Sequence, residues 1–111
     1  RRERQIAFAE RALGRVFETR GQYAEAVEMQ VNALETMLRI GRPIEQSESY
    51  YTLAKLFLNL EDYEAALEGI NQSLALIGDT PPDFPLGLNL ILRAQARLKL
   101  GDHDAALVDA E

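Results

Sequence analysis

Carboxylates, serines and a single histidine are the residues of this sequence that could do acid–base or nucleophilic chemistry. Glu64 and Glu68 are four residues apart, so a helix would place them on one face, one turn from each other. Nothing around them marks an acid–base pair, and a solvated helix face explains them better. Ser47, Ser49 and Ser73 have neither a nearby histidine base nor the glycines of a nucleophile elbow.

His103 is the one histidine, and Asp102 and Asp104 flank it. A zinc site needs several nitrogen or sulfur ligands, and the chain has no cysteine. We interpret the two acids as helix-capping residues and His103 as a residue that packs in a turn. The sequence therefore predicts no catalytic residue, no cofactor-binding residue and no metal site, and a protein that is not an enzyme.

Composition narrows the class of protein further. The 111 residues are rich in Ala, Leu, Glu, Arg and Gln, which favour helices, so we expect an all-α protein. The net charge of −6 argues against nucleic-acid binding and against an anionic membrane surface. No apolar run is long enough to span a bilayer, and the lack of cysteine fits the cytoplasm.

The chain repeats itself at an offset of 40 residues. The strings GQYAEAV, EDYEAAL and GDHDAAL begin at residues 21, 61 and 101. Each unit divides into two apolar-periodic segments separated by a turn of two or three residues, which predicts an antiparallel helix hairpin. The expected helices run over 4–20, 23–40, 44–60, 63–77, 86–100 and 103–111, with the PPDFP string at 81–85 as a connection.

We interpret residues 1–111 as one helical repeat domain with units at about 4–41, 44–78 and 86–111, the last truncated, and as a fragment of a longer protein. Small residues mark where the paired helices approach most closely. A buried stripe and aromatic gap-fillers complete each expected core. The small residues are Gly14, Ala26, Ala33, Ala54, Ala66 and Ser73; the expected core also holds Leu13, Leu53, Phe17, Phe57, Tyr23, Tyr63, Val27, Val31, Leu34 and Leu38.

This joint pattern resembles the tetratricopeptide repeat (TPR) family, in its longer variant of about 40 residues rather than 34. The matching residues in the first unit are Leu13, Gly14, Phe17, Gly21, Tyr23, Ala26 and Ala33. The resemblance implies a right-handed superhelical stack of helix hairpins, a TPR-like α-solenoid. It also implies a scaffold for protein or peptide binding, as the sensory or regulatory module of a larger signalling protein.

In that family the first helices of the units line a concave surface. Carried over to this sequence, the resemblance also places Thr19, Glu48, Leu88 and Ile91 there, beside the eight residues of the candidate peptide-binding surface. These eight are Phe8, Arg11, Arg15, Tyr51, Lys55, Asn59, Gln95 and Lys99. Arginine forks and tyrosines suit an acidic or carboxylate-bearing peptide. Two alternatives stay open at this point. The arginines could simply pair with surface acids such as Glu10 and Glu18, or the array could be a spacer that forms a homodimer through exposed terminal helices.

Overall fold

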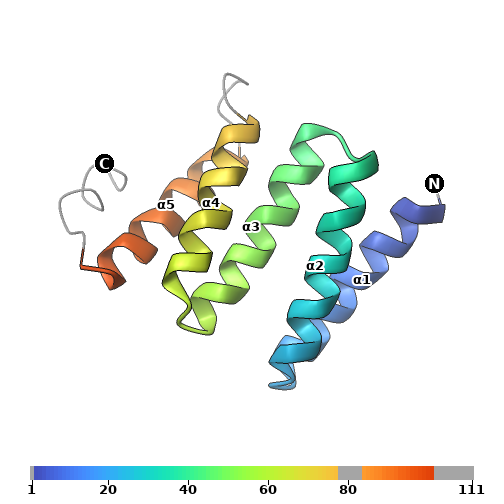
Figure 1. Cartoon of the computed structure of the whole chain (residues 1–111), viewed down its shortest axis with the longest axis horizontal. Helices are drawn as coiled ribbons and strands as arrows, with labels where there is room; N and C mark the ends of the chain where they lie inside the picture. The colour runs from blue at the N-terminus through green and yellow to red at the C-terminus, as the bar shows by residue number, and fades with distance from the viewer. Residues whose placement is uncertain (1, 78–83, 102–111) are drawn as a thin grey trace.

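The computed structural model describes residues 2–77 and 84–101, and these residues form five helices. The helices lie side by side and reverse direction from one to the next, with α1 at one end of the stack and α5 at the other (Figure 1). They are α1 (Arg2–Thr19), α2 (Tyr23–Ile40), α3 (Pro43–Asn59), α4 (Tyr63–Ile77) and α5 (Phe84–Lys99).

The structure confirms the predicted all-α stack of hairpins, and each of the five helices begins and ends within two residues of its predicted bounds. We call α1–α2 the first hairpin and α3–α4 the second hairpin. The sixth predicted helix, from His103 onward, lies outside the described residues. So does the part of the connection at 78–83.

The turns of the first and second hairpins each contain one residue with a positive φ. Gly21 has a φ of 75°, and Glu61 adopts the same conformation at 64°. The next residue then closes the turn, because Gln22 N–H donates to the Phe17 carbonyl at 2.8 Å and Asp62 N–H to the Phe57 carbonyl at 2.9 Å. The two turns are thus alike in hydrogen bonding, although glycine occupies only the first.

Two prolines that the sequence placed in connections instead begin helices. Pro43 is the first residue of α3, and Pro85 follows Phe84 in the first turn of α5. A proline fits there because the first N–H groups of a helix have no intrahelical acceptor. The expected PPDFP connection therefore ends before Phe84.

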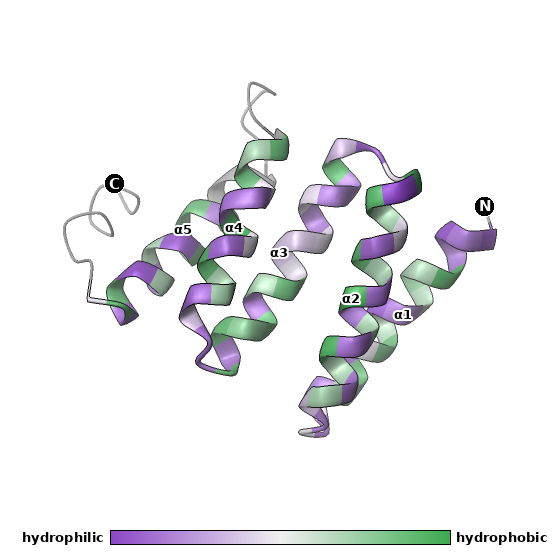
Figure 2. Cartoon of the chain, in the orientation of Figure 1, coloured by the Kyte–Doolittle hydropathy of each residue, from purple (hydrophilic) through white to green (hydrophobic). Residues whose placement is uncertain are grey.

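Small residues lie where the paired helices meet, as the sequence predicts. Gly14, Ala26 and Ala33 are buried in the first hairpin, and Ala54, Ala66 and Ser73 in the second. Each helix in Figure 2 shows both hydrophobic and hydrophilic residues along its length. Some of the buried residues form two separate hydrophobic clusters: Ala7, Ala33 and Met37 in the first hairpin, and Ala54, Ile70, Leu92 and Ala96 between the second hairpin and α5.

Three expected core residues are exposed instead. Leu13 is 48% exposed, whereas its counterpart Leu53 is 9% exposed, because α1 is the end helix and no described element covers that side. Leu38 is 45% exposed because the adjacent Met37 takes the inward position beside Ala7 and Ala33. The third residue, Tyr23, lines a groove.

Candidate functional site

Three polar contacts join α1 to α3 along their length. Arg4 pairs with Glu45, Arg11 Nη2 donates to Thr52 Oγ1 at 3.2 Å, and Asn59 Nδ2 donates to Glu18 Oε2 at 2.7 Å. Every contact joins residues 41 positions apart, and successive contacts are seven residues, or two helical turns, further along. The first helices of the two hairpins therefore lie side by side in one fixed register.

A groove of about 570 Å³ follows this line of contact, and we call it the α1–α3 groove. It brings together four of the eight predicted residues: Arg15, Tyr51, Lys55 and Asn59. The other lining residues come from the same two helices and from the start of α2: Glu18, Thr19, Thr52, Leu56 and Tyr23.

The groove has two exposed cations and one anion. Arg15 and Lys55 form no ion pair with any residue in the described ranges, so both are available to a ligand. The anion, Glu18, accepts the hydrogen bond from Asn59. Guanidinium and ammonium groups on opposite helices can hold a carboxylate between them with charge-assisted hydrogen bonds.

Arg11 behaves differently from Arg15. Its guanidinium is half-buried against Thr52, and this burial lowers its pKa, opposed by the nearby Glu48 carboxylate. Arg11 therefore stabilises the α1–α3 contact and does not line the groove. Its hydrogen bond goes to Thr52, not to the Glu10 or Glu18 partners considered from the sequence.

Gln95 and Lys99 lie in a second hollow, of about 420 Å³, between α3 and α5. Asn59 lines both hollows, so the candidate surface continues from α1 across α3 to α5. The eighth predicted residue, Phe8, is 46% exposed on α1 and lines neither hollow.

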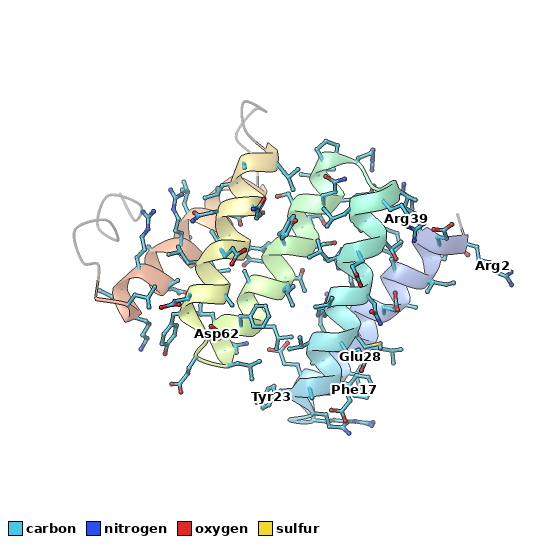
Figure 3. The ribbon with its side chains drawn as sticks, viewed as in Figure 1. Arg2, Phe17, Tyr23, Glu28, Arg39 and Asp62 are labelled. Carbon is cyan, nitrogen blue, oxygen red and sulfur yellow. The ribbon has the colours of Figure 1, made fainter. Side chains whose placement is uncertain are left out.

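Among the residues that line the α1–α3 groove, Tyr23 is one that sequence reasoning assigned to the wrong environment. We expected it to fill a gap in the hairpin core, but it is 44% exposed and lines the α1–α3 groove. Figure 3 shows it at the tip of the first hairpin, at the start of α2. Its counterpart Tyr63 is half-buried and lines the second hollow. The sequence signal that could have placed both tyrosines at these hollows was their position: each is the first residue of the second helix of its hairpin, next to the tight turn.

Neither metal chemistry nor a membrane span finds support in the described ranges. No group of three or more His, Cys, Asp and Glu side chains there could hold a metal ion, while His103 and its flanking acids lie outside them. None of the five helices is both long enough and apolar enough to cross a bilayer.

Comparisons with known proteins agree on the fold. The tetratricopeptide repeat family model matches residues 5–80. The TPR domain of Arabidopsis FLU superposes with a TM-score of 0.87 at 19% identity, covering 96% of this chain and 90% of that one. The second TPR of Spaghetti (RPAP3), bound to the HSP90 peptide SRMEEVD, has a TM-score of 0.75 at 22% identity, covering 97% and 89%. No curated protein matches the sequence.

Proposed function

Because this chain belongs to the tetratricopeptide repeat family of protein-interaction modules, we propose that it binds an acidic peptide segment of a partner protein in the α1–α3 groove. The observation that carries the proposal is the pair of exposed cations, Arg15 on α1 and Lys55 on α3, which face one groove without a described anionic partner. A carboxylate is the complementary ligand for such a pair.

The other lining residues define how the segment would lie. Tyr51 and Tyr23 offer rigid, partly apolar contact area, which is typical of residues that dominate peptide interfaces. Glu18 would repel a second carboxylate at the Asn59 end. The acidic side chain or terminal carboxylate of the peptide would therefore sit between Arg15 and Lys55, with its neighbours against the tyrosines.

The Spaghetti domain supports this class of ligand, since a short acidic peptide occupies a domain of the same fold. At 22% identity we take from it the class and not the contacts. We further propose that the module is the sensory or regulatory part of a larger signalling protein. The cytoplasmic location expected from the cysteine-free sequence stays a prediction.

Fluorescence polarisation with labelled SRMEEVD as the probe would test the groove. Arg15→Glu and Lys55→Glu should each weaken binding about tenfold or more, because each replaces an attraction with a repulsion. Arg2→Glu is the matched control, an identical charge change at an exposed position outside the groove (Figure 3). It should change affinity less than about threefold.

Two results would contradict the proposal. One is an equal loss for Arg2→Glu and Lys55→Glu, which would mean that overall charge alone attracts the probe. The other is no binding of SRMEEVD or of any acidic variant by the folded chain. A spacer without a separate ligand would then be the better description.

A further inference from the structure

A hollow of about 270 Å³ lies between α3 and α4, and we call it the α3–α4 groove. The residues that matter for its chemistry are Tyr50, Leu53 and Phe57 from α3 with Ala65, Glu68 and Gly69 from α4. Leu53 and Phe57 each lie two residues from Lys55, which corresponds to a rotation of about 200° around α3. The groove therefore opens on the side of α3 opposite the α1–α3 groove, and the two share no lining residue.

Gly69 keeps this groove open. A Cβ at this position would lie 3.1 Å from Ala54 Cβ and 3.5 Å from the Tyr50 carbonyl oxygen, so a longer side chain would enter the groove. In the first hairpin the equivalent residue, forty positions earlier, is Met29, so the fold accepts a long side chain at this place in the repeat. Glycine weakens the interior of a helix relative to alanine. The glycine in the middle of α4 thus leaves space for a ligand at the expense of helix stability.

The groove combines aromatic lining with an acidic rim. Tyr50 and Phe57 are seven residues apart, so they lie on the same side of α3, and both are partly buried. Glu68 is exposed and forms no ion pair with any residue that the structure describes. Glu64 lies one turn away from it, and the sequence of α4 contains no lysine or arginine. A complementary ligand offers apolar length to the rings and a positive charge to the carboxylates.

We propose that the α3–α4 groove binds an arginine side chain presented by a basic segment of a partner protein. The aliphatic stem of an arginine can lie along Leu53 while its guanidinium stacks on an aromatic ring and pairs with Glu68. The volume of about 270 Å³ suits one such side chain, since pockets for whole small molecules are larger, at about 300–1,000 Å³. Arginine is also one of the residues that most often dominate the energetics of protein interfaces.

The two grooves select opposite charges. Arg15 and Lys55 in the α1–α3 groove suit a carboxylate, whereas Glu68 beside the α3–α4 groove repels one. Because the grooves open on opposite sides of α3, binding at either needs no contact from the other. One chain could therefore hold an acidic segment and a basic segment at the same time.

An NMR titration of the chain with the capped peptide AARAA tests the proposal, since arginine is the one charged group of this probe. The amide signals of Ala65, Gly69 and Gln72 should shift, with half-saturation at about 1–10 mM, the range for a single anchoring side chain. The same peptide with citrulline in place of arginine keeps the shape and loses the charge. It should bind at least about threefold more weakly.

Two variants distinguish the groove from overall charge. Gly69→Met introduces the side chain that the first hairpin has at this place, and it should abolish the shifts of Ala65 and Gln72. Glu68→Gln should weaken binding about threefold or more. Glu28→Gln is the matched control, because it makes the same change at the equivalent exposed position of the first hairpin. It should change affinity less than about twofold.

Three results would overturn the proposal. They are an absence of shifts with AARAA, equal binding of the citrulline peptide, and an equal loss for Glu28→Gln and Glu68→Gln. Circular dichroism checks that each variant folds, and Glu68→Gln with the citrulline peptide still decides the matter if Gly69→Met does not. SRMEEVD binding by the folded variants should stay unchanged, which separates failure at this groove from failure at the α1–α3 groove.

Discussion

The two hairpins make the same backbone crossing with different side chains. Where α1 meets α2, Ala7 and Ala33 are both fully buried. Where α3 meets α4, the equivalent residues are Ser47 and Ser73, whose hydroxyl oxygens lie 2.7 Å apart. An apolar contact and a buried hydrogen-bonded pair thus occupy equivalent places forty residues apart.

At a second pair of positions the first hairpin has the polar side chain and the second hairpin has the apolar contact. Gly14 and Gln30 in the first hairpin correspond to Ala54 and Ile70 in the second. Gln30 Nε2 donates to the Arg11 carbonyl at 3.1 Å, and it occupies the space that a side chain on Gly14 would need, since a Cβ there would lie 2.4 Å from Nε2.

In the second hairpin, by contrast, Ala54 and Ile70 pack in the apolar cluster with Leu92. The repeat thus fixes where the helices approach, while each pair of facing positions divides the available volume in its own way. The side chains at such a crossing can differ in polarity and size between the hairpins if both members of the pair change together.

The largest expected effect comes from placing a glutamine, as at position 30 of the first hairpin, at the equivalent position of the second hairpin without also changing its partner to glycine. Ile70→Gln should destabilise the protein by about 3 kcal/mol, because the buried amide replaces apolar volume beside Ala54. Adding Ala54→Gly should recover about 1 kcal/mol relative to the sum of the two single changes. The glycine makes room for the amide to donate to the Tyr51 carbonyl, the counterpart of the Arg11 carbonyl.

Urea unfolding followed by circular dichroism would measure this double-mutant cycle. Strict additivity would mean that Gly14 and Gln30 are not a coupled pair. Ala54→Gly alone should cost about 1 kcal/mol from helix propensity, which the cycle subtracts.

An effect of intermediate size concerns the contact from the first hairpin to the second. Hydrogen bonds from the Arg4 side chain and the Arg42 backbone N–H lower the pKa of the Glu45 carboxyl to about 2. Because the folded-state pKa is depressed, the charged form stabilises the fold above pH 5 and this contribution is lost as the pH falls toward 2. Glu45→Gln should therefore cost about 2 kcal/mol at pH 7 and progressively less below pH 5.

Urea unfolding at pH 7, 5, 4 and 3 would follow the difference between Glu45→Gln and the unmodified chain. Glu28→Gln, at an exposed position on α2, is the control and should give a small difference at every pH. A gap for Glu45→Gln that stays constant from pH 7 to pH 3 would show that packing, and not charge, holds Glu45 in place.

Local signals were enough to predict the helices and the turns. The glycine at 21, the small residues and the forty-residue offset depend on neighbours in sequence or on the partner helix in the same hairpin. Exposure of Leu13 could not be predicted in the same way, because it depends on whether another hairpin lies on the far side of α1. The repeat pattern predicts the position of Leu13 on its helix, but it does not predict whether another hairpin packs against that position.

The candidate site was predictable only in part, for a related reason. Lys55 is the equivalent of Arg15 at the forty-residue offset, and Tyr51 and Asn59 lie four residues to either side of Lys55 on α3. The resemblance was therefore enough to place all four on one surface. The different environments of Arg11 and Arg15 depend on Thr52, one position beyond the forty-residue offset. That one-residue shift arises from how the two hairpins stack, and the pattern within a single unit does not contain it.

The smallest expected effect concerns the buried serines of the second hairpin. Ser47 Oγ donates to the Ser73 carbonyl at 3.2 Å, and Ser73 Oγ donates to the Ser47 carbonyl at 2.9 Å. Ser47→Ala should cost about 1 kcal/mol, because it removes one of these bonds and leaves Ser73 with fewer partners. Adding Ser73→Ala should add almost nothing, since the double variant reproduces the contact that Ala7 and Ala33 already make.

Ser49→Ala provides the control for polarity alone. Ser49 is 3% exposed on the same helix, and its Oγ has no hydrogen-bond partner in the described part of the chain. Removing that hydroxyl should leave stability unchanged or raise it by up to about 1 kcal/mol, as thermal unfolding would show. If the double serine variant loses as much unfolding free energy as two separate hydrogen bonds would contribute, then an alanine pair cannot replace the serine pair at this crossing without loss of stability. The hydroxyl pair would then contribute stability that the alanine pair of the first hairpin lacks.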